Sequence, residues 1–275
     1  MKFHAKLAVP PHKKVRLKDF DPAETFGYEK GHEKGDRDEA LMEKTTCRLD
    51  DLQYSLYAEG KRSLLIMLQG MDTSGKDGTI RHVMSGASPQ SCKVTSFKVP
   101  SPEERAHDFL WRIHKATPEK GNIMIFNRSL YEDVLVVRVH NLEPKSVWSE
   151  RYDEINRFEK YLTENGTTIL KFYLHISKDE QKKRLQERIA NPDKHWKLSE
   201  ADFKERQYWD DYVDAYEEAL TKCSTKYAPW FVIPANHKWF RNLAVSKIIV
   251  ETLEKMDPQY PTPQLDIERM KKLLK

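Results

Sequence analysis

The sequence predicts an α/β fold, in which a five-stranded parallel sheet lies between two layers of helices, a three-layer sandwich. Short, continuously apolar segments alternate along the chain with longer segments of helical periodicity, and this alternation is typical of parallel strands joined by crossover helices. With 275 residues, of which 39% are hydrophobic and 11% aromatic, the chain has enough apolar side chains to bury a full core.

The expected elements follow from local signals in chain order. The five expected strands are 63–68, 93–99, 122–126, 167–176 and 230–233. The expected helices are 36–59, 102–115, 148–164, 178–190, 199–222 and 237–256. Capping-box patterns at Ser101-x-x-Glu104 and Ser177-x-x-Glu180 mark the starts of two of these helices. Residues 1–35 are expected to form a basic, largely irregular arm, and residues 257–275 a proline-containing tail.

Charge and cysteine content exclude several protein classes. The 47 basic and 43 acidic residues give a formal net charge of +4, which is too balanced to indicate a nucleic-acid binder by itself. Cys47, Cys92 and Cys223 are far apart, so we expect neither a disulfide framework nor a zinc site. The N-terminus lacks the apolar segment of a signal peptide, and the apolar run 64–68 is too short to span a membrane. We therefore expect a soluble, cytoplasmic protein.

A glycine-rich loop directly follows the first expected strand. Its spacing, Gly70-x-x-x-x-Gly75-Lys76, matches a phosphate-binding loop, and helix-compatible residues follow it. Glycines let backbone N–H groups converge on an anion, the next helix presents its positive end, and Lys76 supplies a mobile charge. The loop therefore predicts a phosphate site built from Gly70, Thr73, Ser74, Gly75, Lys76, Asp77 and Gly78.

Two acidic residues distinguish this loop from the usual pattern. Asp77 stands where a Ser or Thr that binds Mg²⁺ normally follows the lysine. Asp72 lies within the loop, where a carboxylate repels phosphate unless a cation intervenes. A bound Mg²⁺ ion explains such a residue, so Asp72 is the first candidate metal ligand. The alternative is that Asp72 only braces the loop through an Asx turn.

A second polar cluster follows the third expected strand, where ligands of parallel sheets bind. Arg128 can clamp a phosphate, and Asn127 and Ser129 are further candidates for phosphate or nucleotide binding. Asn127 stands where P-loop enzymes commonly carry an Asp that holds Mg²⁺ through water, and Glu132 and Asp133 can compensate for it. The alternative for these two carboxylates is an ordinary solvated first turn of a helix.

These two segments carry a resemblance to a known family. Residues 70–78 resemble the modified Walker A loop of the polyphosphate kinase 2 family, and residues 126–133 resemble its Walker B region. Most members have Asp where Asn127 stands and Asn where Glu132 stands, and the pairing found here is similar to the class III branch. Further similar segments extend the resemblance over about residues 35–255: 96–98, 107–112, 192–197, 228–230 and 238–241.

The resemblance implies a P-loop kinase-like fold similar to thymidylate kinase, with a kinase domain at 36–256 and a helical lid at about 184–200. It implies reversible phosphate transfer from inorganic polyphosphate to AMP and ADP, giving ADP and ATP, with Mg²⁺ or alternatively Mn²⁺. Adenine nucleotides are the expected acceptors, with guanine nucleotides as an alternative, and members of the family are commonly homotetramers. On this basis the expected metal ligands are Asp72 and Glu132, and the groups that hold the transferred phosphate are Lys76, Arg128 and Arg184.

A run of basic side chains between residues 178 and 197 fits the implied lid. We expect Arg188, Lys194 and Lys197 to bind the polyphosphate chain, which carries about one charge per phosphate and, like a nucleic-acid backbone, binds through such a track. The alternative is a solvated helix face whose cations pair with Glu180 and Glu187. Because no series of base-stacking aromatic residues accompanies the run, we prefer polyphosphate to RNA as the ligand.

Two other functions stay open at this point. An ATP-dependent kinase of a nucleotide or another small molecule would share the fold, and Asp77 in place of Ser or Thr argues against it. A non-catalytic RNA- or polyphosphate-binding module would not need the carboxylates of Asp72 and Glu132. We therefore expect a polyphosphate:nucleotide phosphotransferase, with neither nucleic acid nor membrane as a partner.

Overall fold

The computed structural model describes residues 2–28 and 35–274. Five strands form one sheet in the order β2-β3-β1-β4-β5, and every neighbouring pair is parallel. The strands are β1 (Ser63–Gln69), β2 (Cys92–Ser96), β3 (Ile123–Asn127), β4 (Thr167–His175) and β5 (Trp230–Pro234). The predicted α/β fold with a five-stranded parallel sheet is confirmed.

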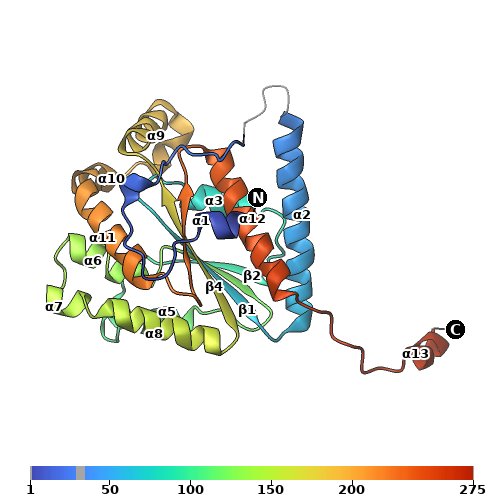
Figure 1. Ribbon diagram of the computed structural model, residues 1–275. Helices are drawn as coiled ribbons and strands as arrows, with labels where there is room; N and C mark the ends of the chain where they lie inside the picture. The colour runs from blue at the N-terminus through green and yellow to red at the C-terminus, as the bar shows by residue number, and fades with distance from the viewer. Residues whose placement is uncertain (1, 29–34, 275) are drawn as a thin grey trace.

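Helices cover both faces of the sheet (Figure 1). One layer contains α2 (Gly35–Glu59), α3 (Lys76–Val83) and α12 (Lys238–Met256). The other contains α8 (Arg151–Glu164) and α11 (Trp209–Cys223). Strand β1 lies at the centre of the sheet and every residue of it is buried, because helices shield both of its faces. None of the described helices is long and apolar enough to cross a membrane.

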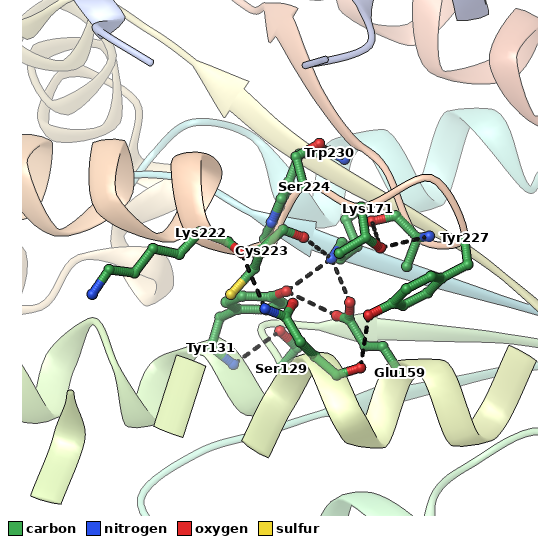
Figure 2. A network of polar contacts seen from close by, with 12 residues as sticks. Ser129, Tyr131, Glu159, Lys171, Lys222, Cys223, Ser224, Tyr227 and Trp230 are labelled. Atoms are coloured by element: carbon green, nitrogen blue, oxygen red, sulfur yellow. Dashed lines mark hydrogen bonds and ion pairs between the residues drawn. The ribbon is translucent and has the colours of Figure 1, made fainter. Parts of the chain in front are cut away.

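A polar network crosses the core beneath the second layer of helices (Figure 2). Lys171 of β4 is fully buried, and its Nζ donates to Oε2 of Glu159, to the hydroxyl of Tyr131 at 2.9 Å and to the carbonyl of Cys223 at 2.6 Å. The Tyr131 hydroxyl donates in turn to Oε1 of Glu159 at 2.8 Å. The network thereby fastens the turn after β3, η2 (Leu130–Asp133), to β4 and α8.

The N-terminal arm packs against the sheet and α12. Its first helix, α1 (Phe3–Leu7), buries Phe3, and the backbone N–H of Phe3 donates to the carboxylate of Glu251 at 3.0 Å. Ala8 then forms an isolated antiparallel bridge with Phe231 of β5. A short turn, η1 (Leu17–Asp19), follows, so the arm has more regular structure than the sequence predicted. Residues 1 and 29–34 of the predicted arm lie outside the described residues.

The prediction of one helix over 102–115 is wrong. The structure has two short helices here, α4 (Pro102–Arg105) and α5 (Trp111–Lys115). The capping box at Ser101 forms completely, but Oδ1 of Asp108 accepts the backbone N–H of Leu110 at 3.0 Å and starts a separate turn. A local side-chain hydrogen bond of this kind competes with the helix, which explains the break.

Other element boundaries also differ from the prediction. The predicted helix over 199–222 is divided into α10 (Glu200–Glu205), η4 (Arg206–Tyr208) and α11. The second capping box is half formed, because Ser177 caps Glu180 but its own N–H donates to Asn236 Oδ1 at 3.0 Å. The remaining helices are α6 (Val136–Val139), α7 (Lys145–Trp148), α9 (Lys178–Ala190), η3 (Pro192–Lys197) and, in the predicted tail, α13 (Ile267–Leu273).

Candidate active site

A cavity of about 760 Å³ opens at the carboxyl ends of the central strands. Its wall combines the glycine-rich loop after β1, the ends of β2 and β3, the basic segment 184–200 and the start of α12. The predicted site residues on this wall are Asp72, Thr73, Gly75, Lys76, Asp77, Gly78, Asn127, Arg128, Arg184, Arg188, Lys194 and Lys197. Three segments that are far apart in sequence therefore meet at one place, as the motifs predicted.

The glycine-rich loop has a backbone that places its polar groups around the start of α3. Gly75 caps α3 at φ +101°, a left-handed conformation that favours glycine, and a Cβ here would collide with Nη1 of Arg241. Thr73 also has a left-handed backbone, at φ +63°. The hydroxyls of Thr73 and Ser74 are buried and have no hydrogen-bond partner among the described residues. Strained backbone and unpaired donors at one loop indicate a ligand site.

Lys76 bends back over its own loop. Its Nζ donates to the carbonyl of Gly70 at 2.7 Å and to that of Met71 at 3.4 Å. Burial lowers the pKa of Lys76, while the nearby carboxylates of Asp72, Glu132 and Asp77 favour the charged form. The ammonium group of Lys76 therefore lies beside the loop, bonded to backbone carbonyls. It makes no ion pair with the described residues, so its charge is available to a ligand.

Arg128 occupies the carboxyl end of β3 in a strained conformation, with φ +64°. Its Nη2 contacts Oδ1 of Asp72 at 3.2 Å, so this pair links the strand end to the loop. Burial opposes the charge, but Glu132 and Asp72 outweigh it and raise the pKa of Arg128. A non-glycine residue held in this conformation is typical of a functional position.

The carboxylates around Lys76 have the donor chemistry that Mg²⁺ prefers. In the described part of the chain, no group of three or more His, Cys, Asp or Glu side chains converges on a metal position. Mg²⁺ commonly binds proteins through one or two carboxylates and completes its shell with water and phosphate oxygens, so Asp72 and Glu132 fit it. Glu132 is not among the residues of the cavity wall, but its charge interacts with those of Arg128 and Lys76, which only partly offset the rise in its pKa that burial causes.

Arg184 lies on the cavity wall, but in this structure its guanidinium binds the protein itself. Its Nε donates to Glu180, Nη1 donates to the carbonyls of Thr73 and Ser74, and Nη2 donates to the carbonyls of Ala235 and Asn236. A guanidinium has five N–H donors, and here all of them bind protein acceptors. Arg184 therefore braces the loop from α9 and has no donor left for a phosphate in this conformation.

Ser129, another candidate for phosphate or nucleotide binding at this strand end, has protein partners in this structure. Its side chain is fully buried, where Oγ accepts hydrogen bonds from Nε2 of Gln69 at 3.1 Å and from the N–H of Tyr131 at 3.3 Å. It caps the turn η2 and does not reach the cavity wall. The side chains that a phosphate can meet here come from Asn127 and Arg128.

Cations in and near the basic segment pair with carboxylates across the cavity. Nη1 of Arg188 contacts Asp202 at 3.3 Å, and Nζ of Lys238 contacts Glu187 at 3.5 Å. Burial and the Asp72 carboxylate raise the pKa of Asp202, whereas the charge of Arg188 lowers it and only partly offsets this rise. Trp196 is 79% exposed on the cavity wall, with Nζ of Lys197 4.8 Å from the centre of its ring.

Sequence reasoning assigned no site role to several residues on this wall. Asp202 falls within the predicted helix 199–222 and received no site role, although it lies on the cavity wall. Lys238 and Arg241 belong to a segment of the family resemblance, but no role was given to them. The sequence did contain a signal for Arg241, because a charged residue stands there in an otherwise largely apolar helical segment. The residues next to it in α12 are almost all buried.

The parallel sheet, the glycine-rich loop that joins β1 to α3 and the cationic cavity above them define a P-loop kinase. Comparison with known families then gives the particular group. The polyphosphate kinase 2 family matches residues 32–261, and the chain belongs to this family.

Individual relatives are similar to the chain over most of its length or all of it. An AMP/ADP-polyphosphate phosphotransferase of Meiothermus ruber is 52% identical over 96% of this chain and 98% of its own length. An ADP-polyphosphate phosphotransferase of Rhodopseudomonas palustris is 50% identical over 80% of this chain and 81% of its own length. The crystal structure of polyphosphate kinase 2 from Arthrobacter aurescens TC1 covers 100% of this chain and 96% of its own, with 44% identity and a TM-score of 0.94.

Proposed function

We propose that the protein is a polyphosphate:nucleotide phosphotransferase, which converts AMP to ADP and ADP to ATP with inorganic polyphosphate as the donor. The observation that carries this proposal is the cavity, in which a phosphate-binding loop faces cations from β3, the basic segment and α12. An elongated polyanion needs such a track on more than one side. The name of the Meiothermus ruber relative supports both acceptors, and that of the Rhodopseudomonas palustris relative supports ADP.

The chain's own residues align the substrates and neutralise their charge. Phosphoryl transfer needs no side-chain nucleophile, because a phosphate oxygen of the nucleotide attacks the terminal phosphate of the chain. The loop N–H groups, Lys76 and Arg128 would hold the transferred group, with their donors preorganised by strained backbone. One phosphoanhydride bond breaks and another forms, so the reaction is reversible.

The residues fit Mg²⁺, with Mn²⁺ as an alternative. Asp72 and Glu132 would hold the ion, and when bound it would screen the repulsion between donor and acceptor phosphates. The Arg128–Asp72 contact of 3.2 Å keeps one of these carboxylates beside the phosphate clamp.

We further propose that residues 184–200 act as a lid within a kinase domain at 36–256. Arg184 would anchor this lid, because it is hydrogen-bonded to the glycine-rich loop. Arg188, Lys194 and Lys197 would bind the polyphosphate chain. Adenine nucleotides are the proposed acceptors, with guanine nucleotides as an alternative. The three unpaired cysteines are consistent with a cytoplasmic protein, and we propose a homotetramer from the family resemblance.

The test is to incubate the protein with polyphosphate, Mg²⁺ and AMP in the absence of ATP, with Lys76→Ala as the matched control. We expect ADP first and then ATP from the unaltered protein only. Product formation that requires ATP as the donor would favour the small-molecule kinase instead. Polyphosphate or RNA binding without any turnover would favour the non-catalytic module.

A further inference from the structure

Arg241 is a buried cation that has no counter-ion among the side chains that the structure describes. It lies in the first turn of α12 and its residue is 3% exposed. Its Nε and Nη2 donate to Oδ1 of Asn242 at 3.1 and 2.8 Å, and its Nη1 donates to the carbonyl of Ser74 at 3.2 Å. These bonds leave one N–H on each Nη without an acceptor in the described part of the chain, where Arg241 also makes no ion pair.

The surroundings of Arg241 make this charge costly. Burial, followed by the charge of Arg184, lowers the pKa of Arg241 to about 10. Arg184 donates to the same Ser74 carbonyl at 2.9 Å, but it also contacts Glu180 at 2.7 Å. An uncompensated buried charge destabilises a fold unless something pairs with it. Arg241 therefore needs an anion that the described protein does not supply.

An anion can reach Arg241 from the active-site cavity. Arg241 and Asn242 line the active cavity, beside Gly75 and Gly78 at the start of α3. An ideal Cβ at Gly78 would lie 3.4 Å from Nη2 of Arg241, so guanidinium and loop backbone are in close contact. Backbone N–H groups at this helix start also favour an anion.

Two other arginines of the wall differ from Arg241 in one respect. Arg128 is paired with Asp72, and Arg188 is paired with Asp202. Arg241, like Lys76 on the loop, has only neutral acceptors among the described residues. Besides Lys76, Arg241 is therefore a wall position at which a ligand's negative charge meets a partly or fully buried cation that has no carboxylate partner.

We propose that Arg241, together with Asn242, forms a subsite for a phosphate of the donor chain that lies beyond the transferred phosphate. This inference rests on the proposed function. A polyphosphate chain presents an anionic unit at each position, so one of its phosphates can supply the missing charge. The phosphates of ATP beyond its γ-phosphate could meet the same need, so the subsite recognises the anionic chain of the donor next to the transferred group.

The first test measures binding of tripolyphosphate alone and of AMP alone by calorimetry, and the change in melting temperature that each causes. In Arg241→Gln we expect tripolyphosphate affinity to fall about tenfold or more, because a charge-assisted contact is lost in a buried site. AMP affinity should stay within about twofold. Lys93→Gln is the control, since it removes an exposed cation that lies outside the cavity wall and has a carboxylate partner, Glu119, and tripolyphosphate affinity within about twofold is expected.

The second variant protects the test against misfolding. Asn242→Asp keeps Arg241 and gives it the missing carboxylate in nearly the same shape. We expect a higher melting temperature without ligand, weaker tripolyphosphate binding, and a loss that persists at high salt, because buried pairs are little screened. A guanidinium that merely braced Ser74 would leave the affinity of Asn242→Asp unchanged.

The outcomes separate this inference from the proposed function. Tripolyphosphate affinity equal to that of the unaltered protein in both variants, or a loss of AMP binding instead, would overturn the Arg241 subsite. Absence of phosphate transfer from polyphosphate by the unaltered protein would overturn the proposed function, whatever the variants bind.

Discussion

The amide of Asn127 donates a hydrogen bond from Nδ2 to Oδ1 of Asp77 at 2.6 Å. The bond joins the carboxyl end of β3 to the first turn of α3. Many P-loop enzymes carry a carboxylate at this strand end and a hydroxyl on the helix. Here the carboxylate is on the helix, where the helix dipole stabilises it, and the strand supplies its hydrogen-bond donor.

This exchange predicts a coupling between the two positions. Asn127→Asp alone brings two carboxylates into contact, so we expect kcat/KM to fall about tenfold through charge repulsion. Adding Asp77→Asn restores the hydrogen bond with the charge on the strand, and most of the activity should return. A double-mutant cycle of kcat/KM measures the coupling. Additive effects of the two changes would show that the pair does not act as a unit.

Lys76→Ala should abolish most of the transfer and leave the fold intact. Loss of a positioned cation in such a site costs on the order of 3 kcal/mol, about a hundredfold in rate. The measurement is single-turnover transfer from polyphosphate to AMP, with the melting temperature as the check on folding. A rate within about threefold of the unaltered protein would contradict the loop's assigned role.

Asp72→Asn should weaken the response to Mg²⁺ as well as turnover. The amide keeps the shape of the side chain but binds a divalent cation poorly. Titration of Mg²⁺ against both activity and melting temperature, with tripolyphosphate present, should show half-saturation at a higher Mg²⁺ concentration. Superimposable titrations and equal rates would return Asp72 to a loop-bracing role.

Arg184→Lys should damage the loop itself, whereas Arg188→Gln should weaken only the donor's binding. Lysine cannot supply the five donors that Arg184 directs at four carbonyls and Glu180, so we expect a loss of about 2 kcal/mol in unfolding free energy or more. Arg188→Gln should raise the KM for polyphosphate at an unchanged melting temperature. Equal melting temperatures for Arg184→Lys and the unaltered protein would argue against the brace.

Lys171→Met should be strongly destabilising, because it leaves the Glu159 carboxylate buried without its partner. Removing one member of a buried pair typically costs about 3–5 kcal/mol. Urea denaturation gives the difference in unfolding free energy, and Lys171→Met combined with Glu159→Leu should recover part of it. A single variant within about 1 kcal/mol of the unaltered protein would mean that Glu159 is readily protonated in the core.

The sequence predicted the sheet and the loop well because their signals are local. The core of β1 and the whole of β5 are continuous apolar segments, and the spacing of Gly70 and Gly75 requires only neighbouring residues. The break before α5 was missed because it depends on one hydrogen bond from Asp108. Helix α13 was missed because its segment is short and follows three prolines.

The site was predictable as a set of segments but not as a set of contacts. The basic run correctly placed Arg188, Lys194 and Lys197 on the cavity wall. The same run could not show that Arg184 turns toward carbonyls of the loop, since those acceptors lie over a hundred residues away in sequence. Pairings such as Arg188–Asp202 likewise depend on tertiary structure.

The ion pairs inside the cavity mean that a bound polyanion would replace protein carboxylates, and not only solvent ions, as the partner of each cation. A polyphosphate chain that bound there as proposed would displace Asp72, Asp202 and Glu187 from their arginine and lysine partners, and it would release fewer counter-ions from solution than its number of contacts suggests. The logarithm of its affinity should therefore fall less steeply with the logarithm of the salt concentration than it does for an open cationic groove. A polyanion whose shape does not let it displace all three carboxylates at once should therefore bind this cavity only weakly.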